Sequence, residues 1–266
     1  DWRVYLLVMI GLVAIQPDLG NAAIIVLTTV VMFSISGVGY RWFTALFAGI
    51  VGISSAFLGL IALVGVQTMA KVPIFGYVAK RFAAYFNPFK DLTGSGLQLS
   101  HSYYAMSNGG WFGLGLGNSI EKTGYLPEAT TDFVFSIVIE ELGLIGAGLI
   151  LALLFFLILR VMIVGVKARN PFNSMMALGV GALMLMQVFV NIGGISGLIP
   201  STGVTFPFLS QGGNSLLVTS VGIAFVLNIA ANEKRDNIVQ AIEEELSQTQ
   251  ELESQDEKIV PLRRSR

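Results

Sequence analysis

The chain has 266 residues, of which 54% are hydrophobic and only 12% carry charge, and its mean hydropathy is +0.72. Soluble domains average about 25% charged residues, so this chain has too little charge for a water-facing surface and is predicted to be a polytopic membrane protein. The net charge of −1 excludes nucleic-acid binding by bulk charge. The lack of cysteine excludes a disulfide framework and a thiolate metal site, and the single histidine excludes a multi-histidine metal site.

Six apolar segments are candidates for membrane-spanning helices, each of which needs roughly 20 mostly apolar residues. In chain order the segments are 4–15, 19–38, 43–66, 142–159, 174–199 and 216–229. Lipid leaves a choice between helices and a closed barrel, and no alternating pattern of short strands appears, so the predicted fold class is all-α. The first segment is too short alone. We therefore interpret the chain as a fragment whose earlier spans are missing.

The short loops between these segments predict the orientation. If the segments alternate, the basic residues of the short loops and of the chain after the last segment share one side: Arg3, Arg41, Lys167, Arg169, Lys234 and Arg235. The positive-inside rule makes that side cytoplasmic. Residues 1–232 then form the membrane domain, with a large extracellular loop at 67–131. Residues 233–266 form a charged cytoplasmic tail that we expect to be solvated and largely disordered.

The extracellular loop is expected to carry two short helices. Phe75, Val78, Phe82 and Phe86 recur at helical spacing with basic residues between them, which is typical of an interfacial amphipathic helix. A second helix is predicted at 98–108, closed by two glycines.

Three basic side chains of the loop have two interpretations. Lys80, Arg81 and Lys122 could hold a lipid diphosphate, or they could contact headgroups by snorkelling. Spacing alone favours snorkelling. The glycine-rich run 113–118 could suggest a nucleotide loop, but no strand precedes it, so we predict a tight turn that brings backbone near the site.

The most informative residue is Asp132, which lies where a long apolar segment begins. A carboxylate inside hydrocarbon is costly, so one at the mouth of a membrane helix is by default a functional-site hypothesis. Glu128, Glu140 and Glu141 lie close to it along the chain, and Lys122 precedes them. Acids and bases gathered at a membrane boundary suggest chemistry on a charged, lipid-borne substrate.

Other polar residues favour structural roles. Gln187 and Asn191 share a helix face and are expected to form interhelical hydrogen bonds. Asp18 either caps a helix or shapes the outer cavity. His101 is expected to be a hydrogen-bonding residue of the loop. The segment 200–214 is rich in glycine, proline and hydroxyls, so it must be buried in protein or line a watery cavity wherever it enters the membrane.

Three blocks of sequence together resemble the SEDS family (shape, elongation, division and sporulation), which includes FtsW and RodA. The first block is Gln16-Pro17-Asp18-Leu19-Gly20. The second contains Arg81, Asn87-Pro88, Gly94-Ser95-Gly96, Gly115-Leu116-Gly117-Asn118-Ser119, Lys122, Tyr125-Leu126-Pro127-Glu128-Ala129, Thr131-Asp132-Phe133 and Glu140-Glu141-Leu142-Gly143. The third is 203–217, with Pro207, Ser210, Gly212-Gly213 and Ser215-Leu216-Leu217. The motifs Gly115-Leu116-Gly117-Asn118-Ser119 and Tyr125-Leu126-Pro127-Glu128-Ala129 are closer to the FtsW branch than to the RodA branch.

The resemblance implies ten membrane helices, of which this chain holds about six, and a peptidoglycan glycosyltransferase that polymerises lipid II at the outer face of the bacterial cytoplasmic membrane during septal wall synthesis. It matches the essential acid to Asp132. The expected partners are lipid II, a class B penicillin-binding protein and other divisome proteins. The chain departs from the family where Thr130 replaces a histidine, Gln211 a tyrosine and His101 a glutamine.

The expected site combines these observations. Asp132 is the predicted catalytic base, while Lys80, Arg81 and Lys122 stabilise the departing diphosphate. Further substrate contacts are expected from Glu128, Ser210 and Ser215, and support from Asp18, Gln98 and Glu141. A divalent cation such as Mg²⁺ or Mn²⁺ could assist, although no cluster of residues dictates a metal site.

Two alternatives belong to other classes of protein. A flippase for the lipid-linked precursor predicts charged residues deep in several spans, whereas here charge gathers at the outer edge. A non-catalytic scaffold for the transpeptidase predicts that Asp132 is dispensable and that helix-packing residues are not.

Overall fold

The computed structural model describes residues 18–37, 81–94 and 96–263, with scattered positions between 5 and 63, and side chains as far as residue 250. The predicted spans 4–15 and 43–66 and the site candidate Lys80 lie outside the continuously described residues. Of the predicted interfacial helix, only 81–86 is described, and this part is helical. The second predicted loop helix is confirmed as α6, Leu97–Gly109.

Four long helices and α6 position the site: α2 (Leu19–Ile35), α7 (Val134–Lys167), α8 (Pro171–Ile195) and α9 (Gly213–Arg263). Within the described residues, three helical stretches are long and apolar enough to cross a membrane, namely Val134–Lys167, Pro171–Ile195 and Gly213–Gln250. A shorter apolar helix covers Gly20–Ile35. The all-α membrane class is therefore confirmed, while the count of six spans stays a prediction.

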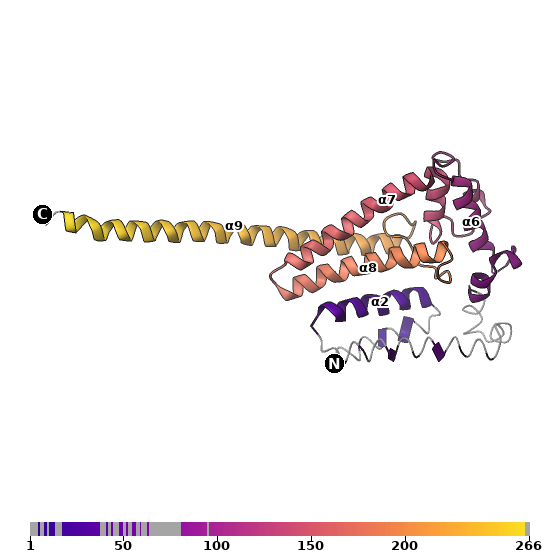
Figure 1. Ribbon diagram of the computed structural model, residues 1–266, viewed down its shortest axis with the longest axis horizontal. Helices are drawn as coiled ribbons and strands as arrows, with labels where there is room; N and C mark the ends of the chain where they lie inside the picture. The colour runs from indigo at the N-terminus through magenta and orange to yellow at the C-terminus, as the bar shows by residue number, and fades with distance from the viewer. Residues whose placement is uncertain are drawn as a thin grey trace.

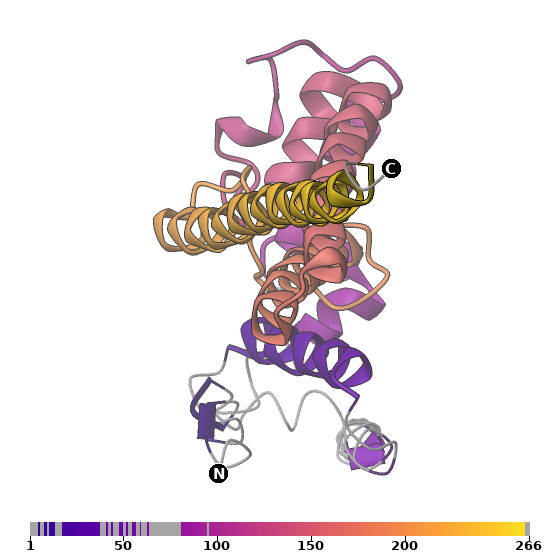
Figure 2. The same cartoon turned by 90° about the vertical axis from the view of Figure 1, so that its left-hand side faces the viewer.

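Helix α8 lies between α7 and α2, as both views show (Figures 1 and 2). Small residues let the helices approach closely. A Cβ built on Gly165 of α7 would lie 3.0 Å from the backbone nitrogen of Leu178 in α8. Ala177 and Ala182 of α8 have no exposed surface. Lipid supplies no hydrophobic driving force between helices, so close packing of small residues holds them together.

Helix α7 is broken at Gly143, whose φ of 70° and ψ of 178° are not helical. The glycine-rich loop after α6 fills the break. The amide of Leu114 donates to the carbonyl of Glu140 (2.9 Å), and the amide of Leu144 donates to the carbonyl of Gly110 (2.9 Å). The run 113–118 thus brings backbone against α7 at the break, and the predicted approach to the site does not appear, because none of these residues lines the pocket at Asp132. At 34 residues, α7 would be about 51 Å long if it were straight, well beyond the ~30 Å hydrocarbon core. The break therefore divides α7 into a short first part and a longer second part that is by itself long enough to span that core.

Replacing Gly143 with alanine is expected to destabilise the protein by about 2–4 kcal/mol. The φ of 70° is unfavourable for alanine, and a Cβ would lie 2.3 Å from the carbonyl oxygen of Trp111. Thermal unfolding of the purified protein in detergent measures the effect. Gly148→Ala is the matched control, since its Cβ would meet nothing within 4 Å in the same helix. Equal melting temperatures for the two variants would contradict the proposed role of the break.

Helix α9 corrects the prediction of a largely disordered tail. The structure continues it as one helix to Arg263 (Figure 1), although its side chains from 234 to 250 are nearly all exposed, as expected for a solvated segment. Arg169, in the short connection before α8, binds the start of this extension. Its guanidinium donates to the side chains of Asn237 and Gln240, and its amide to Glu233 (3.0 Å). These three acceptors lie at helical spacing, so their hydrogen bonds to Arg169 favour continuation of the helix.

Candidate functional site

Asp132 lies in a tight turn immediately before Phe133, the N-cap of α7. The carbonyl of Glu128 accepts hydrogen bonds from the amides of Thr131 (3.1 Å) and Phe133 (3.2 Å). Glu128 adopts a φ of 57°, a left-handed backbone conformation that residues other than glycine rarely adopt. The surrounding structure must therefore hold the backbone of Glu128 in this conformation. Leu126 and Phe133 are each 3% exposed and anchor the turn at both ends. The carboxylate is consequently held at the mouth of the membrane helix, where the sequence places it.

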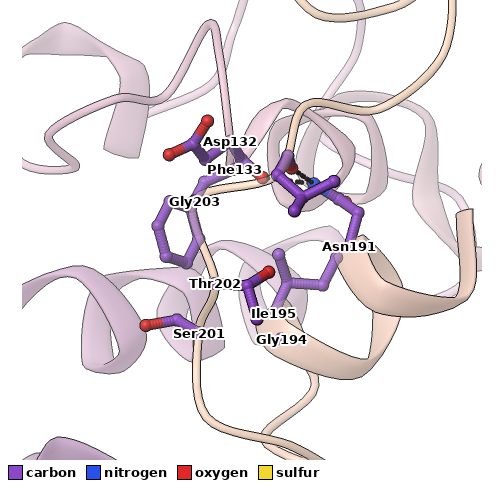
Figure 3. A pocket seen from close by; sticks show the side chains of 9 residues that line it. Asp132, Phe133, Asn191, Gly194, Ile195, Ser201, Thr202 and Gly203 are labelled. Atoms are coloured by element: carbon purple, nitrogen blue, oxygen red, sulfur yellow. Dashed lines mark hydrogen bonds between the residues drawn. The ribbon is translucent and has the colours of Figure 1, made fainter. Parts of the chain in front are cut away.

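The segment after α8 is fastened to this turn. The Asn191 amide group donates to the carbonyls of Asp132 (2.7 Å) and Val204 (2.6 Å). The hydroxyl of Ser210 donates to the carbonyl of Thr131 (2.6 Å), and the Gln211 amide donates to the carbonyl of Thr130 (2.8 Å). A pocket forms between the end of α8, the segment 201–204 and Asp132 (Figure 3). In this view the carboxylate oxygens of Asp132 point away from the side chain of Asn191.

Arg81 and Asp132 face the same small space beside Gly203. A Cβ built on Gly203 would lie 3.1 Å from Nη2 of Arg81 and 3.3 Å from Oδ2 of Asp132. The Arg81 guanidinium also donates to the carbonyl of Ser201, which fixes its direction. Glycine is required here because φ is 78° and because a side chain would fill the space between the two charges. The site therefore presents one cation and one carboxylate to a common point.

The pKa of Asp132 is raised above its ordinary value. Burial is the largest cause, and the negative charges of Glu128 and Asp18 add to it, while the Arg81 guanidinium acts in the opposite direction. A carboxylate with a raised pKa is a stronger base when it is ionised. These electrostatics suit a group that accepts a proton from a hydroxyl.

The structure brings together four of the residues expected at the site: Asp18, Arg81, Glu128 and Asp132. Asp18 also caps α2, because its carboxylate accepts from the backbone amide (3.1 Å) and side-chain amide (2.7 Å) of Asn21. Its two alternative roles are thus compatible. The cap holds the start of α2 against the segment 201–204, where a Cβ on Gly20 would lie 2.4 Å from the Thr202 carbonyl oxygen.

The other expected residues that the structure describes make contacts within the protein. The ammonium of Lys122 pairs with Glu141, next to the break in α7. Ser210 holds the segment after α8, as described above, and the hydroxyl of Ser215 accepts from Thr205 (2.9 Å). Gln98 is half-buried in the first turn of α6 and does not line the pocket. None of these contacts tests a role in substrate binding, which stays a prediction.

A buried carboxylate outside the expected site, that of Glu140, organises the loop. Glu140 has no exposed surface and accepts hydrogen bonds from Asn108 (3.1 Å), the hydroxyl of Ser119 and the amides of Ile120 and Glu121 (both 3.3 Å). A buried charge needs such a full set of partners. His101 contacts Glu121 (2.6 Å), which confirms it as a hydrogen-bonding residue of the loop.

Sequence reasoning also missed Gly203 as part of the site, and it recognised Asn191 as a hydrogen-bonding residue without identifying its backbone partners. The signals for Gly203 were the glycine-rich composition of 200–214 and its place at the start of the third block, and neither indicates its contacts with Arg81 and Asp132. Across the described part of the chain, no group of three or more histidine, cysteine or acidic side chains could hold a metal ion.

Comparison with known proteins gives consistent results. The sequence model of the FtsW, RodA and SpoVE family, described as "cell cycle protein", matches residues 1–235. A "probable peptidoglycan glycosyltransferase FtsW" of Lactococcus lactis is 52% identical over 237 residues, covering 89% of this chain and 56% of the relative. The corresponding protein of Bacillus subtilis is 42% identical over 229 residues, covering 84% and 54%. The chain thus spans about half the length of the curated relatives it matches.

Two solved structures are similar. One, from work on the structural coordination of polymerisation and crosslinking by a peptidoglycan synthase complex, has a TM-score of 0.63 and 26% identity, covering 87% of this chain and 61% of that one. The other, an aspartate-to-alanine mutant of the rod shape determining protein RodA from Thermus thermophilus, has a TM-score of 0.54 and 23% identity, covering 87% and 56%. The latter supports the fold alone.

Proposed function

Because the chain belongs to the FtsW, RodA and SpoVE family of cell cycle proteins, we propose that it is part of a peptidoglycan glycosyltransferase that polymerises lipid II into glycan strands. The observation that carries the proposal is the geometry at Gly203, where the Asp132 carboxylate and the Arg81 guanidinium face one point at the mouth of a membrane helix. The names of the curated relatives support the same activity.

The proposed reaction is a single displacement at the anomeric carbon of a lipid-linked donor. Asp132 takes the proton from the attacking sugar hydroxyl as the hydroxyl oxygen bonds to that carbon. The bond from the carbon to the lipid diphosphate breaks, and the diphosphate leaves with its electron pair. A positioned general base is typically worth about 10²–10⁴-fold in rate. No covalent intermediate forms, so the configuration at the donor carbon is inverted.

The departing diphosphate needs positive charge. Among the candidates that the structure describes, Arg81 is the nearest to Asp132, and its planar guanidinium can donate two parallel hydrogen bonds to a phosphate. Lys80 precedes it in sequence and is a second candidate, outside the described residues. Lys122 is paired with Glu141, so it would have to leave that partner to bind a diphosphate. A divalent cation such as Mg²⁺ or Mn²⁺, which the diphosphate itself would help to bind, stays a prediction.

We also propose that the site faces outward from the cytoplasmic membrane and that the full protein acts during septal wall synthesis with a class B penicillin-binding protein and other divisome proteins. The basic residue Arg169 and the solvated extension of α9 lie at the opposite end of α8 from Asn191 and Asp132, which supports this orientation under the positive-inside rule. The peptidoglycan synthase complex to which the chain is similar supports a crosslinking partner.

The test uses the purified full-length protein, with and without its transpeptidase, given labelled lipid II. Polymeric glycan is the expected product, separated by gel electrophoresis. A parallel assay in liposomes measures movement of lipid II between leaflets. Movement without polymerisation would favour the flippase instead, and neither activity would favour the scaffold.

The activity is expected to rise with pH. Burial and the charges of Glu128 and Asp18 raise the pKa of Asp132, and the base works only when ionised. The value of kcat/KM should therefore rise through an inflection above the usual range of an aspartate. Glu128→Gln removes one charge that raises this pKa, so the inflection should move to lower pH. A profile that falls with rising pH over this range would contradict a general base at Asp132.

A further inference from the structure

Three buried oxygen atoms have no hydrogen-bond partner among the protein groups of the described chain: Oγ1 of Thr28, Oε1 of Gln187 and Oδ1 of Asn191. Thr28 belongs to α2, and the other two residues belong to α8. A buried polar atom left unpaired costs free energy, and native proteins usually satisfy it with ordered water.

The register of the two helices places Thr28 and Gln187 in the same part of the contact. Ile24 of α2 clusters with Val190 of α8, and Met32 of α2 lies 3.5 Å from a Cβ built on Gly179 of α8. The helices are thus antiparallel. Thr28 lies one turn from each of its two contact residues in α2 and on the same face. Gln187 lies between the two contact positions in α8. Thr28 and Gln187 are therefore at similar depth on facing sides.

Asn191 lies one turn above Gln187 on α8, nearer the pocket that it lines. Side chains four residues apart on a helix are neighbours, with Cβ atoms about 5–6 Å apart. That spacing is right for two acceptors bridged by one water molecule. The chemistry of the three atoms also fits. A water molecule can accept from the Thr28 hydroxyl and donate one hydrogen each to Gln187 and Asn191.

We propose that Thr28, Gln187 and Asn191 bind an ordered water between α2 and α8, and that this water orients Asn191 as a positioning residue for Asp132. Asn191 is 3% exposed, and its amide group holds the carbonyls of both Asp132 and Val204. Fixing the amide plane from the oxygen side fixes both donor hydrogens. The role in catalysis rests on the proposed function, whereas the water site does not.

A pair of adjacent threonines offers a matched test in the full-length protein. Thr28→Val has nearly the same shape but no hydroxyl, and it is expected to lower kcat about fivefold, the effect of losing one hydrogen bond, with KM for lipid II unchanged. Thr29→Val is the control, because the Thr29 hydroxyl bonds to the Ile25 carbonyl (2.7 Å) within α2. Thr28→Ser keeps the hydroxyl and should retain wild-type kcat. Asn191→Leu should lower kcat about 100-fold through misplacement of Asp132.

A cryo-EM map of the full-length protein that resolves ordered water gives a readout independent of activity. Density within hydrogen-bond distance of all three oxygens is expected in the wild type and not in Thr28→Val. Side chains that bond directly to one another there, with no water between them, would overturn the water site. Density combined with equal kcat for Thr28→Val and Thr29→Val would overturn the positioning role. If the wild type polymerises nothing, the proposed function fails and the map still decides the water site.

Discussion

Replacing Asp132 with asparagine is expected to lower the rate of glycan polymerisation by about 10²–10⁴-fold. Asparagine has nearly the same shape as aspartate and cannot accept the proton of the attacking hydroxyl. The backbone carbonyl of residue 132 can still accept from Asn191, so the turn before α7 should be preserved. The measurement is the initial rate of polymer formation from labelled lipid II by the full-length protein, compared at equal amounts of folded protein.

The melting temperature separates loss of chemistry from loss of structure. The raised pKa of Asp132 means that the folded state disfavours the ionised form, chiefly because of burial. In the unfolded state this penalty is absent, so ionised Asp132 lowers stability as the pH rises from the ordinary pKa of an aspartate through the folded-state value. A neutral asparagine carries no such penalty, and the variant should melt at or above the wild-type temperature at neutral pH. Full polymerase activity in a correctly folded Asp132→Asn variant would remove this residue from the mechanism.

The sequence predicts those parts of the structure that depend on local pattern. Asp132 stands out because a carboxylate precedes a long apolar run, and α6 is predicted from a short segment that ends in two glycines. The cap at Asp18 follows from an acidic side chain at the start of an apolar helix. In each case the residues that determine the feature lie within a few positions of one another.

The remaining features depend on residues far apart in sequence. Gly143 lies at the start of the predicted span 142–159 and by itself predicts no break, whereas its contacts with the loop at 110–115 explain why α7 breaks there. Lys122 is a plausible ligand for a phosphate until Glu141 is brought against it. The helical extension of α9 was missed because the composition of the tail predicts that it is exposed to solvent but does not predict its hydrogen bonds with Arg169. The site residue Gly203 was missed for the same reason, as its neighbours Arg81 and Asp132 are remote in the chain.

Gly203→Ala is expected to lower kcat about 100-fold, since a small displacement of reacting groups can cost this much. The added methyl group would lie 3.1 Å from Nη2 of Arg81 and 3.3 Å from Oδ2 of Asp132, in the space where the proposed mechanism places the reacting atoms. The φ of 78° also strains an alanine, so the segment 201–204 would shift and carry the carbonyl that holds Arg81 with it. Initial rates over a range of lipid II concentrations give kcat and KM separately.

Gly212→Ala provides the matched control in the same segment. Its Cβ would lie 3.4 Å from Cβ of Ser215, an ordinary contact, and its backbone is not in the left-handed region. Strain at Gly203 costs about 1–3 kcal/mol of stability, so both variants are compared at a temperature well below unfolding, with folded protein quantified by size-exclusion chromatography. A Gly203→Ala variant with the kcat of Gly212→Ala would show that the space between Arg81 and Asp132 is not where the reaction occurs. A selective loss in Gly203→Ala, together with the loss in Asp132→Asn, would locate the reaction between Arg81 and Asp132. One substitution removes a carboxylate and the other adds a methyl group, so the only property that they share is their position beside this space.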